Sequence, residues 1–471
     1  MYEFIYYALS AVKDCALRVG ILIAIAAVVV IPLYRRYTAV NGDGKGFPWS
    51  KIILVIVLVG YLVALDNVTL NKGSSYNWDY NLHLFRSWRD AWNQFSLQPW
   101  LNVLLNTFMF APLGMILPFL HHRFRKWYTL LITSFGVSLY IEITQWLFGK
   151  GLLDVDDLFC NMLGAMIGFF FIKAIIVIKD KQAGRFKIAA QNLALGLLPI
   201  ACIIGIFIWY DAKEYGNLPN DATYTINTKD TQWNLQCTLP ETNTSMPVYR
   251  TDRRTFEECD SFAEQFKKII GTDDYHTISY YQDAAYYIDH SGDENGAHML
   301  QVSYKDLGFD YSVMGEIPLP GELDQAQLET LLSEFPVFVP EYSQFLDEGN
   351  GWYSFRVDKH VTQTEMIDGI LRCRYSNDGM ICAIEDHLQI YSFYRIADVI
   401  TVQQAMESLY AGKWRFPNDE ECSLSGTISI YECSLEYEVD TKGFYRPVYY
   451  FDIVTEEGNH IKDIMISALA Y

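Results

Sequence analysis

The chain has 471 residues, a net charge of −20 and 51% hydrophobic residues. Residues 1–213 hold 19 Lys and Arg against 12 Asp and Glu, whereas residues 214–471 hold 17 against 44. An acidic surface excludes nucleic acid as a partner, because phosphates are bound by an excess of Lys and Arg. The long apolar runs lie almost entirely in the first part, so we expect a lipid-embedded part followed by a water-soluble part.

The first part contains six apolar runs that approach or reach the roughly 20 residues needed to cross a bilayer. They lie near residues 16–34, 51–66, 99–120, 127–148, 158–179 and 189–210. The first run ends in Pro32–Arg36 rather than at a small-residue cleavage site, which predicts a retained helix and not a signal peptide. The third run contains Pro112 and Gly114, which we expect to kink it.

Basic residues alternate between the loops that join these runs. The first, third and fifth loops are rich in Lys and Arg, namely Arg35, Arg36, Lys45 and Lys51; Arg123, Arg125 and Lys126; and Lys179, Lys181, Arg185 and Lys187. The positive-inside rule therefore makes these loops cytoplasmic and both termini external. We expect a multi-pass protein of the cell membrane with an extracellular C-terminal domain, which would be repelled by anionic lipid and stand off the bilayer.

From Glu214 onward the pattern changes to short alternating runs rich in Tyr, Val, Ile and Phe. Runs at 276–288, 388–395 and 447–454 predict strands, and Asn377-Asp378-Gly379 and 440–443 predict turns. Helical patterns lie near 255–270, 321–334 and 401–411, the last of them capped by Thr401. The expected fold class is an α-helical transmembrane bundle of about six spans followed by a soluble antiparallel α+β domain. The expected domains are 1–50, 51–179, 180–213 and 214–471, with a possible division of the last near 336–340.

Six of the nine cysteines lie in the second part, at positions 237, 259, 373, 382, 422 and 433. No C-x-x-C pair occurs, which excludes zinc-ribbon and thioredoxin-like sites. Disulfides in an oxidising space and free thiols packed as small apolar residues both remain open.

Polar residues recur at helical spacing inside the membrane part. Ser134, Ser138, Glu142 and Gln145 share one face of the fourth run, and Asp157, Asn161, Gly164 and Gly168 share one face of the fifth. Asn102 and Asn106 lie four apart on the third run. These segments place amides and carboxylates at one depth, near the external end.

A carboxylate inside a span costs at least a few kcal/mol unless it is paired or hydrated, so Glu142 is a functional candidate. The alternative is structural, with Glu142 bonded to Asn106 and Asn161 between helices. Gly164 and Gly168 are more typical of close helix packing than of ligand contact. The aspartates at 154–157 could offer oxygen ligands to a divalent cation. The same run is also typical of a helix N-cap. We expect neither a metal nor a cofactor.

These motifs together resemble the VanZ-like family. The residues that carry the resemblance are 81–88, Asn102 to Asn106, Pro112 to Pro118, Ser138, Glu142, Gln145, 154–157, Asn161, Gly164 and Gly168, which places it over residues 50–175. The family is named for a protein linked to low-level teicoplanin resistance, so the resemblance implies a role in the cell envelope and no defined reaction. The family pattern and the helical spacing pick out the same ligand-binding candidates: Asn106, Glu142, Gln145, Asp154, Asp157 and Asn161. We add Arg86, whose guanidinium could bind an anionic group of a ligand.

Residues 214–471 resemble, less specifically, the cystatin-like modules of envelope regulators of the YycH/YycI or PepSY kind. This resemblance rests on Gly351-Trp352-Tyr353, the 377–379 turn, the 401–411 helix and the segment from Tyr437 to Tyr449.

Three functions remain open. The first is a binding or resistance factor that engages a glycopeptide or a lipid-linked wall precursor. The second is a sensor whose external domain binds a partner protein and which needs a membrane partner to pass a signal. The third is a membrane-embedded enzyme acting on a lipid-linked substrate, which is disfavoured because no nucleophile–base pair, H-E-x-x-H or phosphate loop is present.

Overall fold

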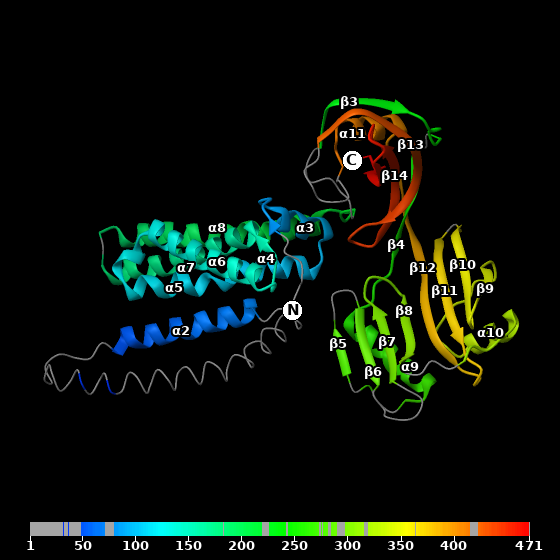
Figure 1. The fold of residues 1–471 in the computed structure, drawn as a ribbon, viewed down its shortest axis with the longest axis horizontal. Helices are drawn as coiled ribbons and strands as arrows, with labels where there is room; N and C mark the ends of the chain where they lie inside the picture. Colours follow the sequence, from blue (N-terminus) through cyan, green and yellow to red (C-terminus); the bar gives the residue numbers. More distant parts are fainter. Residues whose placement is uncertain are drawn as a thin grey trace. The chain divides into compact units, whose positions relative to one another are not determined.

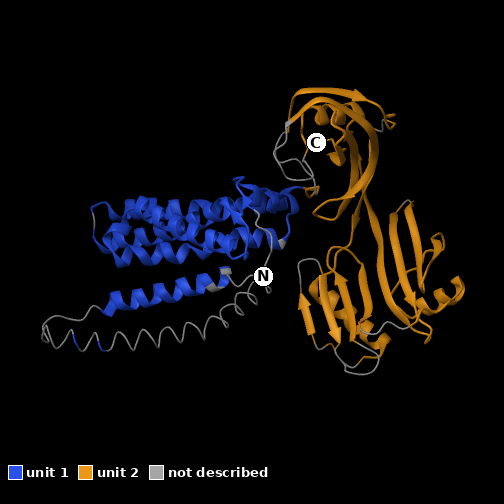
Figure 2. Cartoon of the chain, viewed as in Figure 1, with its two compact units in different colours: residues 1–213 blue, residues 214–471 orange. Residues whose placement is uncertain are grey.

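The computed structural model describes residues 32, 36, 49–70, 80–181, 183–218, 226–241, 244–272, 275, 277–280, 284–289, 297–314, 319–362, 364–414 and 423–470. The chain divides into two compact units, residues 1–213 and residues 214–471, coloured separately in Figure 2. Each is described by itself below.

Unit 1 is helical (Figure 1). Its helices are α2 (Trp49–Leu70), α3 (Arg86–Gln94), α4 (Leu97–Met109), α5 (Ala111–Leu120), the 3-10 helix η1 (His122–Arg125), α6 (Trp127–Leu147), α7 (Val155–Lys179) and α8 (Arg185–Ala212). Among the described residues, five segments are long and apolar enough to cross a membrane: α2, α4 with α5, α6, α7 and α8. The prediction of an α-helical membrane bundle is confirmed for these five, and the run at 16–34 lies outside the described residues.

The third predicted span is interrupted at Phe110, where α4 ends and α5 begins. Pro112 lies in the first turn of α5, where a missing N–H costs nothing because that group has no partner in the helix anyway. The break between α4 and α5 therefore lies before Pro112, and Gly114 lies within α5. Helix α3 was not predicted, because its nine residues are mostly polar and fall in what the sequence suggested was a loop.

Helix α7 is the central helix of unit 1, since it packs against α4, α5, α6 and α8. Three glycines permit this contact. A Cβ on Gly164 would lie 1.5 Å from the carbonyl oxygen of Thr107, and a Cβ on Gly168 would lie 2.1 Å from that of Ala111. A Cβ on Gly114 would lie 1.9 Å from the carbonyl oxygen of Ala165. The small residues thus let α7 approach the backbone of α4 and α5.

Unit 2 is an α+β unit whose sheet is mostly antiparallel, as predicted. Its strands are β3 (Asn227–Leu235), β4 (Ser245–Thr251), β5 (Thr277–Tyr280), β6 (Ala284–Asp289), β7 (Ala297–Ser303), β8 (Phe309–Met314), β9 (Gln344–Gly349), β10 (Trp352–Val361), β11 (Glu365–Tyr375), β12 (Ile381–Asp398), β13 (Ser423–Val439), β14 (Phe444–Val454) and β15 (His460–Ser467). Its helices are α9 (Phe256–Ile270), α10 (Gln325–Leu332) and α11 (Val402–Tyr410), each opened by a capping box.

Strand β12 connects two hydrophobic cores in unit 2 (Figure 1). Its first half pairs with β8 at residues 383–386, and its second half pairs with β4 at residues 391–398. One core is built from residues 215–248 and 397–469, and the other from residues 259–388. Phe335, Val337 and Val339 pack against the second core.

The described cysteines of unit 2 are free thiols: Cys237, Cys259, Cys373, Cys382 and Cys433. Four of these side chains are buried, which fits the packing of a thiol as a small apolar group.

Candidate functional site

The carboxylate of Glu142 on α6 accepts a hydrogen bond from the residue that precedes α7. Glu142 is 2% exposed and lies one helical turn after Ser138, which is also buried. Its Oε2 accepts the backbone N–H of Asp154 at 3.2 Å. The predicted proximity of Glu142 to the start of α7 is therefore present as a direct contact.

Asp154 ties the start of α7 to a distant loop. It caps α7 by accepting the backbone N–H of Asp156 at 2.8 Å. Its carboxylate also accepts from Asn81 Nδ2 at 2.9 Å and from Ser87 Oγ at 3.3 Å. The backbones pair as well, because the two-residue strands β1 (Tyr80–Asn81) and β2 (Leu153–Asp154) form a parallel bridge.

Asp156 stabilises the start of α3 from another helix. The residue preceding α3, Phe85, has no side-chain acceptor and a left-handed backbone with φ of 68°. The buried carboxylate of Asp156 accepts the backbone N–H groups of Phe85 and Ser87 instead, the latter at 2.7 Å. It thus satisfies donors that the helix itself leaves unpaired. Arg86 lies between these two residues in the sequence and is half-buried.

Two further polar residues of α7, Asp157 and Asn161, bind the neighbouring helices. Asn106 on α4 donates its amide to Asp157, and Asn161 donates its Nδ2 to Ser138 Oγ at 2.8 Å. Asn161 is 3% exposed, and its Oδ1 is buried without a hydrogen-bond partner among the described residues. A buried acceptor left in this state costs free energy, which a ligand or water carrying a donor would recover.

We call Asn106, Ser138, Glu142, Asp154, Asp156, Asp157 and Asn161, with Asn81 and Ser87, the polar cluster. It joins α4, α6, α7 and the 80–87 segment at one end of the bundle. Gln145 is directed elsewhere, because its Nε2 donates to the backbone carbonyl of Thr69 on α2 at 2.8 Å.

A row of exposed amides continues the cluster along α4. Gln98, Asn102 and Asn106 recur every four residues and so share a face. Asn106 is half-buried against Asp157, whereas Gln98 and Asn102 are exposed and bonded to each other at 3.2 Å. The polar surface therefore grades from fully buried at Asn161 to exposed at Asn102.

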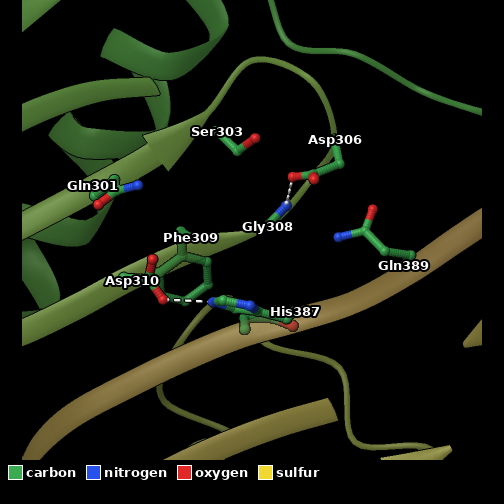
Figure 3. A pocket seen from close by; sticks show the side chains of 9 residues that line it. Gln301, Ser303, Asp306, Gly308, Phe309, Asp310, His387 and Gln389 are labelled. Carbon is green, nitrogen blue, oxygen red and sulfur yellow. Dashed lines mark hydrogen bonds and ion pairs between the residues drawn. The ribbon is translucent and has the colours of Figure 1, made fainter. Parts of the chain in front are cut away.

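A second polar site lies in unit 2, where β12 leaves β8 and before it joins β4 (Figure 3). The cavity is about 170 Å³ and is lined by Gln301, Ser303, Asp306, Gly308, Phe309, Asp310, Asp386, His387 and Gln389. His387 Nε2 lies 2.7 Å from Asp310 Oδ1, and this bond raises the pKa of the imidazole. Burial raises the pKa of the Asp386 carboxyl to about 6.

Sequence reasoning missed Asp156 as a site residue and missed the whole cavity. Asp156 belongs to the acidic run at 154–157, and its position in the first turn of α7 is the sequence feature that could have identified it as a site residue. No local sequence pattern indicates the cavity, because its residues come from β7, β8, the loop between them and the distant strand β12. Among the described residues there is no group of three or more His, Cys, Asp and Glu side chains arranged to hold a metal ion.

Residues 50–177 match the model of the VanZ/LLP1 family. No curated protein is significantly similar to the chain. None of these comparisons supports a cystatin-like or PepSY module in residues 214–471.

Proposed function

Starting from a VanZ/LLP1 family domain at residues 50–177 of a multi-pass membrane protein, we propose that the polar cluster is a binding site of the cell envelope. The protein would contribute to teicoplanin-type glycopeptide resistance, or to the handling of wall precursors, by engaging a ligand at this end of the bundle. The alternation of basic loops supports placing this end, and unit 2, outside the cell.

The observation that carries the proposal is the buried Oδ1 of Asn161, which has no hydrogen-bond partner among the described residues. Helices that only need to adhere can do so with fully paired amides and hydroxyls, as Asn161 Nδ2 and Ser138 do. Glu142, Asp154, Asp156 and Asp157 bring four carboxylates to this end of the bundle, where they accept hydrogen bonds from side chains and from backbone N–H groups. The Oδ1 of Asn161 lies one helical turn after Asp157 on α7, and a ligand that carries an N–H or O–H donor would satisfy it.

Replacing Glu142 by Gln separates this role from a structural one. The amide keeps the size of the side chain and an oxygen that can accept the N–H of Asp154, so the variant should reach the membrane in normal amount. We expect it to lose the teicoplanin protection that the wild-type chain gives to a susceptible host. The readouts are the minimum inhibitory concentration and the abundance of the protein in membranes.

A matched control is Thr144→Val on the same helix. Thr144 is half-buried, and its hydroxyl donates to the backbone carbonyl of Tyr140 on the same helix. This variant should keep full protection. Equal protection by the Glu142→Gln variant at equal abundance would contradict a binding role for Glu142.

A further inference from the structure

Two loops beside the polar cluster expose large apolar side chains. We call residues 80–85 and 147–152 the apolar rim; its exposed members include Leu82 at 65% and Phe148 at 72%, with Tyr80, Leu84, Phe85, Leu147 and Leu152. The bridge between Tyr80 and Leu153 holds the two loops together. Soluble surfaces rarely expose apolar groups so densely, so the rim needs a nonpolar environment.

The position of the rim along the helices indicates what covers it. Helix α6 has 21 residues, or about 31 Å, which matches the thickness of the hydrocarbon core. Trp127 and Tyr128 are exposed at its first end, and Phe148 directly follows its last residue. Trp and Tyr at one end of a span mark a membrane interface, and the 21 residues of α6 reach from there to the opposite interface. The rim therefore lies at interfacial depth.

Helix α3 gives an independent indication of the same depth. Trp92 on α3 stacks on Trp209 of α8 with ring centroids 4.9 Å apart, and the Lys213 ammonium lies 5.3 Å from the centre of the Trp92 ring. Trp209 is 61% exposed. Tryptophan rings next to a lysine at the end of a span are typical of the headgroup layer.

The 80–87 segment has two different sides. Its apolar side chains form half of the rim, whereas Asn81, Ser87 and the backbone N–H of Phe85 bond to Asp154 and Asp156 of the polar cluster. A molecule with an apolar tail and a polar head could contact both sides at once. The exposed amides Gln98 and Asn102 on α4 extend this polar surface onto a face of a membrane-spanning helix.

We infer that the ligand of the polar cluster is the headgroup of a membrane lipid, which reaches the cluster from within the bilayer across the apolar rim. The tail lies along Leu82 and Phe148, and a hydroxyl- or amine-bearing headgroup donates to Asn161 Oδ1. This inference rests on the proposed function, because it assigns a ligand class to the same site. It excludes a ligand that arrives from water without a membrane anchor.

Photocrosslinking in the full-length protein tests this inference. Leu82, Phe148 or Asn102 is replaced by p-benzoylphenylalanine, and each variant is placed in nanodiscs of phosphatidylethanolamine and phosphatidylglycerol. Two reference positions calibrate the yield: Ile132, which is 69% exposed on the membrane-spanning α6, and Leu346, which is 59% exposed in unit 2. After irradiation, intact-protein mass spectrometry measures the fraction of chains heavier by one phospholipid.

We expect adducts at Leu82, Phe148 and Asn102 at a yield close to that at Ile132 and far above that at Leu346. Yields at Leu82 and Phe148 no higher than at Leu346 would overturn the interfacial position of the rim. Adducts at the rim without adducts at Asn102 would overturn the route from the bilayer to the cluster. The Glu142→Gln phenotype is read separately, so loss of protection without lipid adducts would refute this inference and leave the proposed function standing.

Discussion

Arg446 and Asp440 form an ion pair with no solvent exposure of either side chain, at 3.6 Å between Nε and Oδ2. Asp440 also accepts the backbone N–H of Gly216 at 2.7 Å, and Thr441 Oγ1 accepts that of Asn217 at 2.8 Å. A Cβ on Gly216 would lie 2.5 Å from the backbone nitrogen of Lys442, so only glycine fits here. These hydrogen bonds hold Gly216 and Asn217 against the turn between β13 and β14.

Breaking this pair should destabilise unit 2. We predict that a fragment of residues 214–471 folds alone, and that Asp440→Ala lowers its free energy of unfolding by about 3–5 kcal/mol, because Arg446 is left buried without its carboxylate. Urea unfolding followed by circular dichroism measures the change. Arg356→Ala is the control, since the pair with Asp358 is exposed and worth less than about 1 kcal/mol. Similar losses in the two variants would contradict the prediction, and a disordered 214–471 fragment would contradict independent folding.

Close packing of α7 gives a prediction for its glycines. Gly164→Ala would place a methyl group 1.5 Å from the Thr107 carbonyl oxygen, so the helices must separate. We expect a loss of about 1–3 kcal/mol, seen as a lower melting temperature of the detergent-solubilised protein. In Gly136→Ala the new methyl meets nothing within 4 Å, and the melting temperature should hold or rise. A tolerated Gly164→Ala would argue against tight contact between α7 and α4.

The cavity in unit 2 predicts a stability that falls as pH rises. Burial raises the pKa of Asp386 from 3.8 to about 6, so between these values the folded state keeps a proton that the unfolded chain releases. Ionisation then opposes folding by on the order of 3 kcal/mol. The pKa of His387 is raised by its bond to Asp310, so its contribution is present below pH 6.5 and is lost as pH rises through the folded value.

This prediction is measured as the unfolding free energy of residues 214–471 between pH 4 and pH 8. The groups facing Asp386 are Arg254, Asp306, Asp310 and His387. Asp386→Asn keeps an oxygen for the backbone N–H of Leu388 and should remove the loss of stability between pH 4 and pH 6. An unchanged pH profile in this variant would assign the dependence to other groups.

Orientation in the membrane can be tested by labelling introduced cysteines with an impermeant reagent. Because basic residues concentrate in the odd loops, Ser74→Cys should react from outside and Gly184→Cys should not. Ser74 lies outside the described residues, whereas Gly184 precedes α8. The reverse labelling would place the C-terminal unit in the cytoplasm.

The amino-acid sequence by itself determined where the spans lie and which class of fold follows them. Apolar runs of about 20 residues mark α2 and α4 to α8 because a bilayer offers no partners to the backbone, so length and hydropathy suffice. Helices α9, α10 and α11 were predictable for a similar local reason, since Thr401 and Gln404 cap α11 within four residues.

Only the tertiary structure decided how the polar residues pair. Helical spacing placed Glu142 and Asn161 on faces, but it does not say how far each helix is rotated toward its neighbours, so it could not direct Gln145 to the backbone of α2. Asp156 meets Phe85 across 71 positions, and His387 meets Asp310 across 77. Contacts at such separations depend on the packing of the whole unit, which local patterns do not encode.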